Sequence, residues 1–324
     1  MSRQRGPVRA SRCKNDARRL VGYWVTEVAM CNASDIRDLF PEVKDNLTKV
    51  TWAHAVNSQK KLDDALQSDI MMLEADVIVG TLNTSGVNAT DIPIMGHPPA
   101  NESDLSLEDF LRQVLKNGKK GVKLDFKSYS AFSQSQPVIQ DLFENATLPL
   151  WINADILAGP VNASKPDELF ESFVKDTVQH FPTSTLSPGW TTRYGEAYNI
   201  TDGQYTEEHV KEMLKSLSEA NVTQSITYPV RAGLAANNVT AMESLLKGSP
   251  LESNATLTIW SSAGDHVDKQ KLSSLIKTIG VDKVYLDVPK EVLDGLDVSN
   301  STASAAGSLA LGLTLVNLMA IRLL

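Results

Sequence analysis

The sequence predicts an α/β fold in which eight parallel strands alternate with helices and close into a (β/α)8 barrel of the TIM type. The 324 residues suit one such barrel, which needs roughly 250 residues plus insertions. Between residues 47 and 289, short β-rich apolar runs alternate with amphipathic helical patterns. This alternation favours right-handed crossovers, and eight strands favour closure. A doubly wound open sheet is the alternative that the pattern leaves open.

The strands are expected at eight places along the chain. They are residues 50–54, 70–77, 121–126, 148–153, 184–190, 225–230, 257–260 and 284–288. Seven amphipathic segments separate them; in residues 106–118, for example, Ser106 and Asp109 form a helix start and Gly118 a stop. The predicted organisation is an N-terminal segment of uncertain structure over 1–46, the barrel over 47–298, and a small-residue spacer with an apolar tail over 299–324.

Composition narrows the class of protein. Hydrophobic residues make up 42% of the chain and charged residues 22%, which is typical of a globular protein with a sizeable core. The formal charge of −8 disfavours binding to nucleic acid and to anionic membrane surfaces. The two cysteines, Cys13 and Cys31, both precede the first expected strand, so the predicted core has no disulfide framework.

Asn-x-Ser/Thr acceptors for N-glycans are unusually frequent, and most fall in expected loops or helix ends. The twelve acceptors are Asn32, Asn46, Asn83, Asn88, Asn101, Asn145, Asn162, Asn199, Asn221, Asn238, Asn254 and Asn300. Chance would place only a handful in a chain of this length. They predict a glycoprotein of the secretory pathway, located outside the cell or at its surface.

The two ends of the chain bear on the same question. Residues 1–19 are Arg-rich, and the apolar run 20–27 is too short for the core of a signal peptide, so no secretory signal is visible. A missing upstream segment, a wrong start and an organelle transit peptide are the alternatives. Small residues over 299–308 followed by an apolar run over 309–324 resemble a lipid-anchor (GPI) signal, with attachment near 299–301. A C-terminal amphipathic or short membrane helix is the other interpretation.

Polar side chains gather at the expected C-terminal ends of the first three strands, which share one mouth in a barrel. His54 follows the first strand, and His97 follows the second. Glu74 and Asp76 lie two residues apart on a strand and therefore face the same way, toward the interior. Asp125 from the third strand completes a group of three carboxylates.

Such a group of anions needs a positive partner when it is buried. Three oxygen ligands with open positions predict a Mg²⁺ or Ca²⁺ site at Glu74, Asp76 and Asp125. Lys127 shares a strand face with Asp125 and is expected either to meet a substrate phosphate or to form a structural ion pair with the acidic residues. Two histidines beside a metal suit acid and base chemistry in phosphoryl transfer.

Further candidates for substrate binding lie at or beyond strand ends. They are Asn57, Asn153, Asp155, Tyr228, Arg231 and Trp260. Tryptophan at such places packs in the core or the rim, or offers an aromatic face to a choline-type headgroup. Arg231 is either a second phosphate contact or one side of an ordinary surface ion pair.

The order of these motifs resembles the glycerophosphodiester phosphodiesterase and sphingomyelinase-D/phospholipase-D toxin superfamily, which consists of TIM barrels of the phospholipase-C-like phosphodiesterase type. The segments that carry the resemblance are His54-Ala-Val-Asn57, Glu74-Ala-Asp76, His97 and Leu124-Asp-Phe-Lys127. It implies that the two histidines are acid and base and that the acidic residues hold Mg²⁺ or Ca²⁺. The sequence departs from these enzymes at Ala55, where glycerophosphodiesterases have a basic residue, and over 96–101, which lacks the acid and cysteine of the toxin loop.

A second and closer resemblance, over 52–287, is to the menorin-like family of animal proteins. It rests on His54-Ala-Val-Asn-Ser58, Leu73-Glu-Ala-Asp-Val77, Gly96-His-Pro-Pro99, Gly121-Val-Lys-Leu-Asp-Phe-Lys127, Trp151-Ile-Asn-Ala-Asp155 and Gly159-Pro160. This resemblance implies an extracellular or membrane-bound role in neuronal patterning and neural tissue maintenance.

Two functions follow as hypotheses. One is a metal-dependent phosphodiesterase or lyase acting on a phospholipid-like or glycerophosphodiester-like headgroup at the cell surface. The other is a menorin-type recognition or adhesion cofactor that retains the site without turnover and acts through a cell-surface protein partner. A sugar-processing barrel is less consistent with the sequence, because carboxylates alone leave both histidines and Lys127 unexplained.

Overall fold

The computed structural model describes residues 18–20, 23–25, 35–84, 87–166, 170 and 172–299. Residues 300–324 of the lipid-anchor signal predicted over 299–324, both cysteines, and most of the N-terminal segment lie outside these residues. The strands are β1 (Arg18–Leu20), β2 (Tyr23–Val25), β3 (Trp52–Ala53), β4 (Met72–Thr84), β5 (Val87–Met95), β6 (Glu102–Ser103), β7 (Gly121–Phe126), β8 (Leu150–Ala158), β9 (Thr185–Thr191), β10 (Ile226–Arg231), β11 (Ala255–Trp260) and β12 (Val284–Asp287). The α-helices are α1 (Ile36–Leu39), α2 (Gln59–Gln67), α3 (Leu107–Asn117), α4 (Tyr129–Phe143), α5 (Phe173–His180), α6 (Glu207–Glu219), α7 (Ala232–Ala235), α8 (Val239–Lys247), α9 (Lys269–Ile279) and α10 (Lys290–Leu293), with 3-10 turns η1 (Leu47–Lys49), η3 (Glu196–Tyr198) and η4 (Glu252–Asn254).

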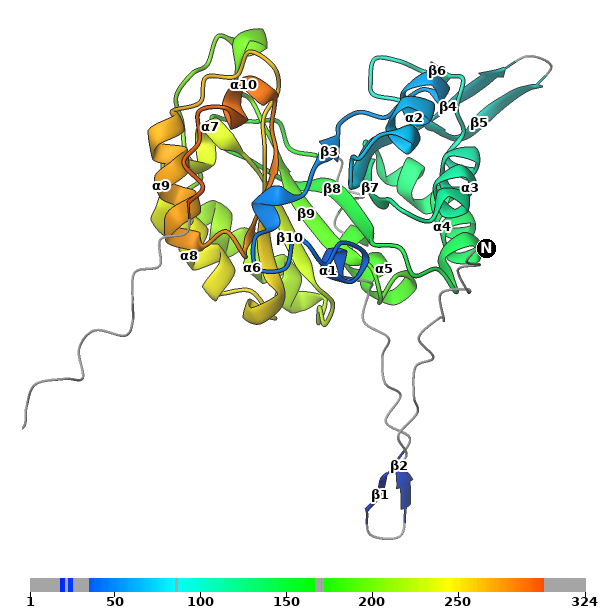
Figure 1. Cartoon of the computed structure of the whole chain (residues 1–324), viewed down its shortest axis with the longest axis horizontal. Helices are drawn as coiled ribbons and strands as arrows, with labels where there is room; N and C mark the ends of the chain where they lie inside the picture. The colour runs from blue at the N-terminus through cyan, green and yellow to red at the C-terminus, as the bar shows by residue number, and fades with distance from the viewer. Residues whose placement is uncertain are drawn as a thin grey trace, which may run out of the picture.

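Eight of the strands form a nearly closed parallel barrel. Their order is β3-β4-β7-β8-β9-β10-β11-β12, every neighbouring pair is parallel, and the helices lie outside the strands (Figure 1). Each of the eight expected strands is present, so the alternation of strand and helix was interpreted correctly and the open doubly wound sheet is excluded. Helix α3 begins at Ser106, whose hydroxyl accepts from Asp109 N, and ends at Gly118 with φ of 67°, as the sequence predicted.

The second barrel strand is longer than the sequence indicated. Strand β4 continues past the barrel to Thr84 and turns back as β5, and the antiparallel hairpin projects from the barrel (Figure 1). Its own small core consists of Ile78, Leu82 and Ile94. The hairpin returns the chain to the barrel mouth, because Met95 pairs with Val77 and Gly96 N donates to Asp76 O at 3.0 Å.

Aromatic side chains close the N-terminal end of the barrel. The rings of Trp52 and Trp151 are 5.4 Å apart, and those of Trp151 and Tyr285 are 4.8 Å apart. Ile36 of α1 packs in the same cluster. Polar chemistry is thereby confined to the other end of the barrel, where the strands carry their carboxyl ends.

No strand pairing joins β3 to β12 within the described residues, so this junction is a seam in the barrel wall. Three contacts bridge the seam: Leu47 N donates to Val281 O at 2.8 Å, the rings of Trp52 and Tyr285 meet at 6.3 Å, and His54 binds Asp287. Among the helices described, none is both long and apolar enough to cross a membrane.

Candidate active site and metal centre

The two-residue repeat of strands β4 and β7 builds the centre of the site. In their parallel register Glu74 lies beside Lys123, and Asp76 lies beside Asp125. Because alternate residues of a strand share a face, these four side chains all point into the barrel, while Leu73, Ala75 and Leu124 pack in the surrounding core. The alternation of side chains along β4 and β7 therefore places these charged residues inside the barrel.

Glu74, Asp76 and Asp125 form a compact oxygen cluster. One carboxylate oxygen from each lies within 4.8 Å of the others. Glu74 is 1% exposed and Asp76 is 4% exposed, so water does little to screen their mutual repulsion. Three anionic oxygen donors that converge in this way suit a hard divalent cation such as Mg²⁺ or Ca²⁺.

The loop after β3 orients two of these carboxylates. Asn57 binds Asp76 twice, since its Nδ2 donates to Asp76 Oδ2 at 2.6 Å and its Oδ1 accepts from Asp76 N at 2.9 Å. Ala55 has a φ of 53°, and its N–H donates to Glu74 Oε2 at 2.7 Å. Val56 N donates to Glu74 O at 2.9 Å. The segment His-Ala-Val-Asn is thus a clamp on the end of β4, and Asn57, predicted as a substrate contact, supports a carboxylate.

Strands β8 and β9 hold the third carboxylate. Asn153 Nδ2 donates to Asp125 Oδ1 at 2.8 Å, and Ser187 Oγ donates to Asn153 Oδ1 at 2.6 Å. Asn153 is 2% exposed. This predicted substrate residue is therefore a buried support for Asp125, and Ser187, which the sequence did not single out, supports it in turn. Outer partners of this kind fix the orientation of metal ligands.

Two lysines share the interior with the carboxylates. Lys127 Nζ lies 2.6 Å from Asp125 Oδ2 and 2.8 Å from Asp76 Oδ1, so the structural ion pair that the sequence left open is present. Burial alone would lower the pKa of Lys127, but Asp125 and Asp76 raise it well above its usual range. Lys123, which is 4% exposed, was missed, although it lies in phase with Asp125 and Lys127 in the sequence.

The interior carries more negative than positive charge. Five carboxylates interact there with two lysines and one histidine: Glu74, Asp76, Asp125, Asp155 and Asp287 with Lys123, Lys127 and His54. With every one of these groups ionised, three cations against five anions leave two negative charges, which one divalent cation would neutralise. Uncompensated charges at such depth cost several kcal/mol each.

The pKa values of the carboxyl groups reflect this excess. Burial and the neighbouring Asp125 raise the pKa of Asp155 to about 7, although Lys127 and Lys123 oppose the shift. Burial also raises the pKa of Glu74, which His54 partly offsets. Burial would raise the pKa of Asp125 as well, but Lys127, Lys123 and the hydrogen bonds from Lys127 and Asn153 hold it below its usual value.

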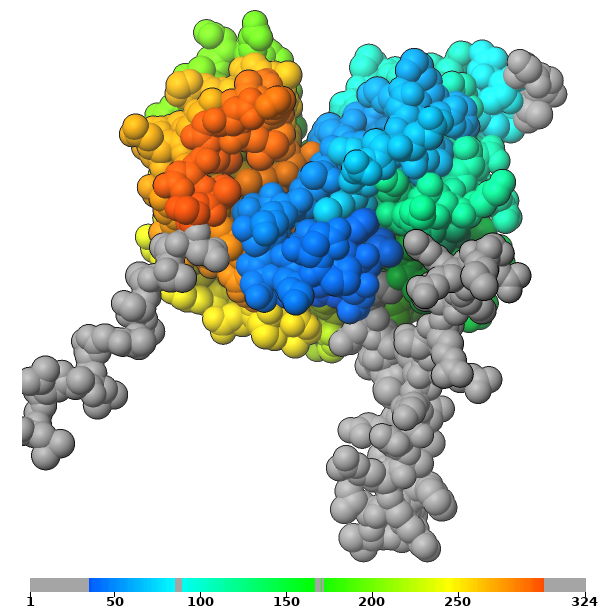
Figure 2. Space-filling model, in the orientation of Figure 1, coloured from blue at the N-terminus to red at the C-terminus, as the bar shows by residue number. Residues whose placement is uncertain are grey.

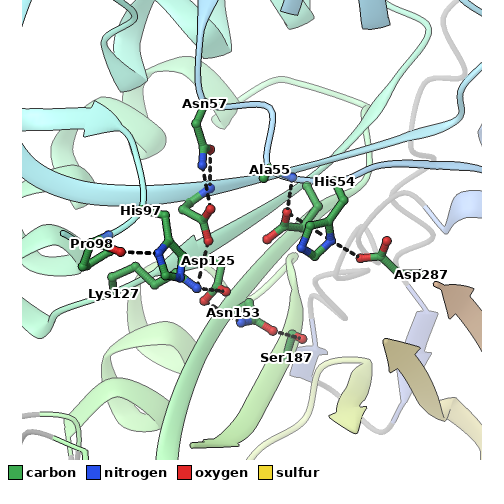
Figure 3. Close-up of polar contacts among 12 residues, drawn as sticks. His54, Ala55, Asn57, His97, Pro98, Asp125, Lys127, Asn153, Ser187 and Asp287 are labelled. Carbon is green, nitrogen blue, oxygen red and sulfur yellow. Dashed lines mark hydrogen bonds and ion pairs between the residues drawn. The ribbon is translucent and has the colours of Figure 1, made fainter. Parts of the chain in front are cut away.

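His54 and His97 are held in the same manner, each through Nδ1. His54 Nδ1 lies 3.0 Å from Asp287 Oδ2 and 3.5 Å from Glu74 Oε2, and His97 Nδ1 lies 2.6 Å from Pro98 O (Figure 3). Both main partners of Nδ1 are oxygen acceptors, so Nδ1 carries the proton and Nε2 is the nitrogen left for chemistry. Burial lowers the pKa of His54, but Glu74 and Asp287 outweigh it and raise the pKa to about 9.

Of the predicted substrate residues beyond the cluster, Tyr228 is placed differently from what was expected, whereas Arg231 and Trp260 make contacts within the protein. Tyr228 is wrong as a mouth residue, because its side chain is fully buried in the core outside the barrel and its hydroxyl donates to Ser249 Oγ at 2.9 Å. Arg231 lies in a buried pair with Asp265, with Nε–Oδ2 of 2.8 Å and Nη2–Oδ1 of 2.7 Å. Its guanidinium also covers the ring of Trp260 at 5.0 Å.

Asp287 is a third residue that sequence reasoning missed, after Ser187 and Lys123. It is the last residue of β12 and is separated from His54 by 233 positions in the chain. The only signal was its place at the end of the last expected strand, where a polar residue faces the mouth. Through this contact the first and last barrel strands both contribute to the site.

Comparisons with known proteins show the family of the chain. Two solved structures resemble the chain with low identity and low TM-scores. The GH26 domain of an endo-β-mannanase/endo-β-glucanase from Prevotella bryantii is 9% identical, with a TM-score of 0.47 over 84% of this chain and 96% of that one. The HpcH/HpaI aldolase from Desulfitobacterium hafniense DCB-2 is 7% identical, with a TM-score of 0.35 over 75% of this chain and 87% of that one. The human protein FAM151B is 35% identical over 240 residues, which is 74% of this chain and 82% of that protein. Residues 46–293 match the model of the Menorin N-terminal domain. The chain therefore belongs to the menorin family.

Proposed function

We propose that this menorin-family protein is a metal-dependent phosphodiesterase or lyase that acts on a glycerophosphodiester or phospholipid-type headgroup. One observation carries the proposal: two histidines, each oriented through Nδ1 by an oxygen acceptor, lie at the mouth where three carboxylates, two of them buried, converge within 4.8 Å (Figure 3). Acid and base groups beside an anionic cluster that fits a divalent cation are what cleavage of a phosphodiester requires.

In this proposal His54, His97 and Lys127 have separate roles. His54, which Glu74 and Asp287 favour in its protonated form, delivers a proton from Nε2 to the leaving oxygen. His97, with its Nδ1 proton held by Pro98 O, accepts the proton of the attacking hydroxyl at Nε2. Lys127, 22% exposed, presents its ammonium beside the cluster and offsets charge on the nonbridging phosphate oxygens.

The metal site is proposed at Glu74, Asp76 and Asp125. Their geometry and the two excess negative charges of the interior fit one Mg²⁺ or Ca²⁺. When bound, such a cation supplies Lewis-acid stabilisation of a phosphate oxygen. Asn57 and Asn153 hold two of the ligands in place, and Asp155 is the remaining carboxylate beside them.

A place outside the cell or at its surface, with N-glycans, is part of the proposal. Of the twelve acceptor asparagines, seven of those described are exposed and none of those described is buried: Asn83, Asn101, Asn145, Asn162, Asn199, Asn221 and Asn254 are the exposed ones. Asn238 is the least suited, because its Nδ2 already donates to Tyr205 O at 3.0 Å. Anchoring through a C-terminal lipid rests on the sequence alone.

One observation favours the second candidate, a cell-surface recognition protein that binds a protein partner and does not turn over substrate. Lys127 already bridges Asp76 and Asp125, so part of the cluster is neutralised within the protein itself. A site of this kind persists as a structural ion pair after catalysis is lost.

The two candidates differ in turnover. Purified protein is incubated with glycerophosphodiesters and lysophospholipids, with and without Mg²⁺ or Ca²⁺, and the released headgroup is measured. The proposal predicts divalent-dependent release that disappears in His54→Ala and Glu74→Ala and persists in His180→Ala, which alters a half-buried histidine at the C-terminal end of α5. If folded wild type releases nothing from any substrate with either metal, the recognition protein is the better account.

A further inference from the structure

We propose that the open seam between β3 and β12 is a groove for the acyl chain of a single-chain phosphodiester lipid, whose headgroup occupies the mouth. This inference rests on the proposed function and names its substrate class. The seam described above runs along the outer face of the barrel, beside His54.

The seam lacks the helix that covers the other strands. Each of the first seven barrel strands is followed by a helix of 8 to 15 residues, which for β10 is α8 after the four-residue α7. Strand β12 is followed, within the described residues, by α10 alone, which has 4. Beyond α10 the described chain turns toward α9, where Asp297 N donates to Ser273 Oγ at 3.0 Å. Within the described residues, no helix therefore lies across the seam, and the surface is hollowed between α10 and the segment around β3 (Figure 2).

A cavity of about 700 Å³ occupies the seam. Its apolar walls are Val50, Trp52, Ile70, Leu286, Val288 and Leu293, and the side chains of Lys49 and Lys290 also line it. The volume and the mainly apolar lining are those of a small-molecule site, which typically measures about 300–1,000 Å³. Leu293, 40% exposed, is one of two large hydrophobic side chains that are exposed in the described part of the chain. An exposed leucine on an apolar cavity is stabilised when a ligand covers it.

The cavity is continuous with the proposed active site. His54 and Asp287, which form the acid and its partner, both line it. A ligand that is charged at the mouth and apolar along the seam matches this arrangement. A lysophospholipid has both parts, a phosphodiester and one acyl chain.

The groove would select ligands by the length of their acyl chain. Each methylene buried in an apolar groove strengthens binding by up to about fourfold, until the chain outgrows the cavity. Affinity should therefore rise steeply from hexyl to dodecyl phosphocholine and then level off. Glycerophosphocholine, which has no chain, should be indifferent to substitutions in the groove.

The test separates binding from turnover. Binding of alkylphosphocholines with brominated chains is measured below their micelle-forming concentrations by quenching of tryptophan fluorescence, because Trp52 lines the cavity. Turnover is measured in parallel on glycerophosphocholine and on lysophosphatidylcholines of increasing chain length. The groove variant is Leu293→Asp, and the matched control is Tyr198→Asp, which alters the other exposed large hydrophobic side chain.

The expected result is chain-length-dependent quenching that weakens at least tenfold in Leu293→Asp and is unchanged in Tyr198→Asp. If quenching follows this pattern but no substrate is turned over, the groove stands and the proposed function fails. If headgroup is released without any dependence on chain length or on Leu293, the function stands and the groove is overturned. Equal binding of one-chain and two-chain lipids also overturns it, because the proposal commits to a single chain.

Discussion

Replacement of Asn57 by alanine probes the support of the proposed metal centre without touching a proposed ligand. Asn57 makes two hydrogen bonds to Asp76, one to the carboxylate at 2.6 Å and one from its backbone N–H at 2.9 Å. Asp76 is 4% exposed, so water cannot easily replace either bond. The variant leaves Glu74, Asp76 and Asp125 in place, and any change in divalent affinity therefore reports how well they are oriented.

The expected loss of stability follows from the two hydrogen bonds between Asn57 and Asp76. A hydrogen bond to a charged acceptor contributes about 1.5–3 kcal/mol and one between neutral groups about 1 kcal/mol. The free energy of unfolding of the metal-free protein should therefore fall by about 2.5–4 kcal/mol. Loss of an outer partner of a metal ligand typically costs roughly 10- to 100-fold in metal affinity. The concentration of Mg²⁺ or Ca²⁺ needed for half-maximal stabilisation should rise by that factor.

Urea unfolding at graded divalent concentrations measures both effects in one experiment, because a ligand that binds only the folded state adds stability that depends on its concentration. Asn117→Ala is the matched control: it removes a single hydrogen bond, from Nδ2 to Leu66 O at 3.3 Å, and should leave the divalent dependence unchanged. The reasoning is refuted if Asn57→Ala and wild type are stabilised equally at every divalent concentration.

Three further changes test the surroundings of the site. In the metal-free protein burial lowers the pKa of His54, but Glu74 and Asp287 outweigh it and raise the pKa to about 9. The stabilisation from the charge on His54 is therefore complete below a pH of about 6.5 and is lost as the pH rises through 9. An NMR titration should show the pKa of His54 falling by a unit or more in Asp287→Asn, and an unchanged pKa contradicts the pairing. Gly189→Ala places a Cβ 2.5 Å from Asp155 Oδ1 and should cost about 1–3 kcal/mol in urea unfolding, whereas an unchanged midpoint would show that the carboxylate yields freely. Lys123→Met removes a buried cation and should destabilise the metal-free protein by about 3–5 kcal/mol, with part of the loss restored by saturating Ca²⁺; loss of the same size with and without the ion argues against a shared charge balance.

Much of the barrel was predictable because strand and helix patterns are local. Strand β7 was placed at its observed residues, and Ser106 and Gly118 marked the ends of α3 through contacts within a few residues. The β4–β5 hairpin was missed, because apolar residues over 70–77 already accounted for a barrel strand. The Ser-Gly pair at 85–86 was the available sign of a turn beyond it.

The site was predictable where it depends on alternation and not where it depends on closure of the barrel. Glu74 and Asp76 had to share a face, and register then brought Asp125 beside them. Asp287 could not be assigned to His54, because nothing local links residues 233 positions apart. Tyr228 and Arg231 are three apart on one strand and so point to opposite faces, which should have excluded one of them from the mouth.

The central claim is that the barrel interior holds one divalent cation between Glu74, Asp76 and Asp125. Isothermal titration of Mg²⁺ or Ca²⁺ into the metal-free full chain tests it most directly. The structure predicts one ion per chain for wild type, binding at least 100-fold weaker in Glu74→Gln, and unchanged binding in Glu108→Gln, which alters an exposed glutamate on α3. Absence of binding to the folded wild type, or equal binding to wild type and Glu74→Gln, would contradict the claim.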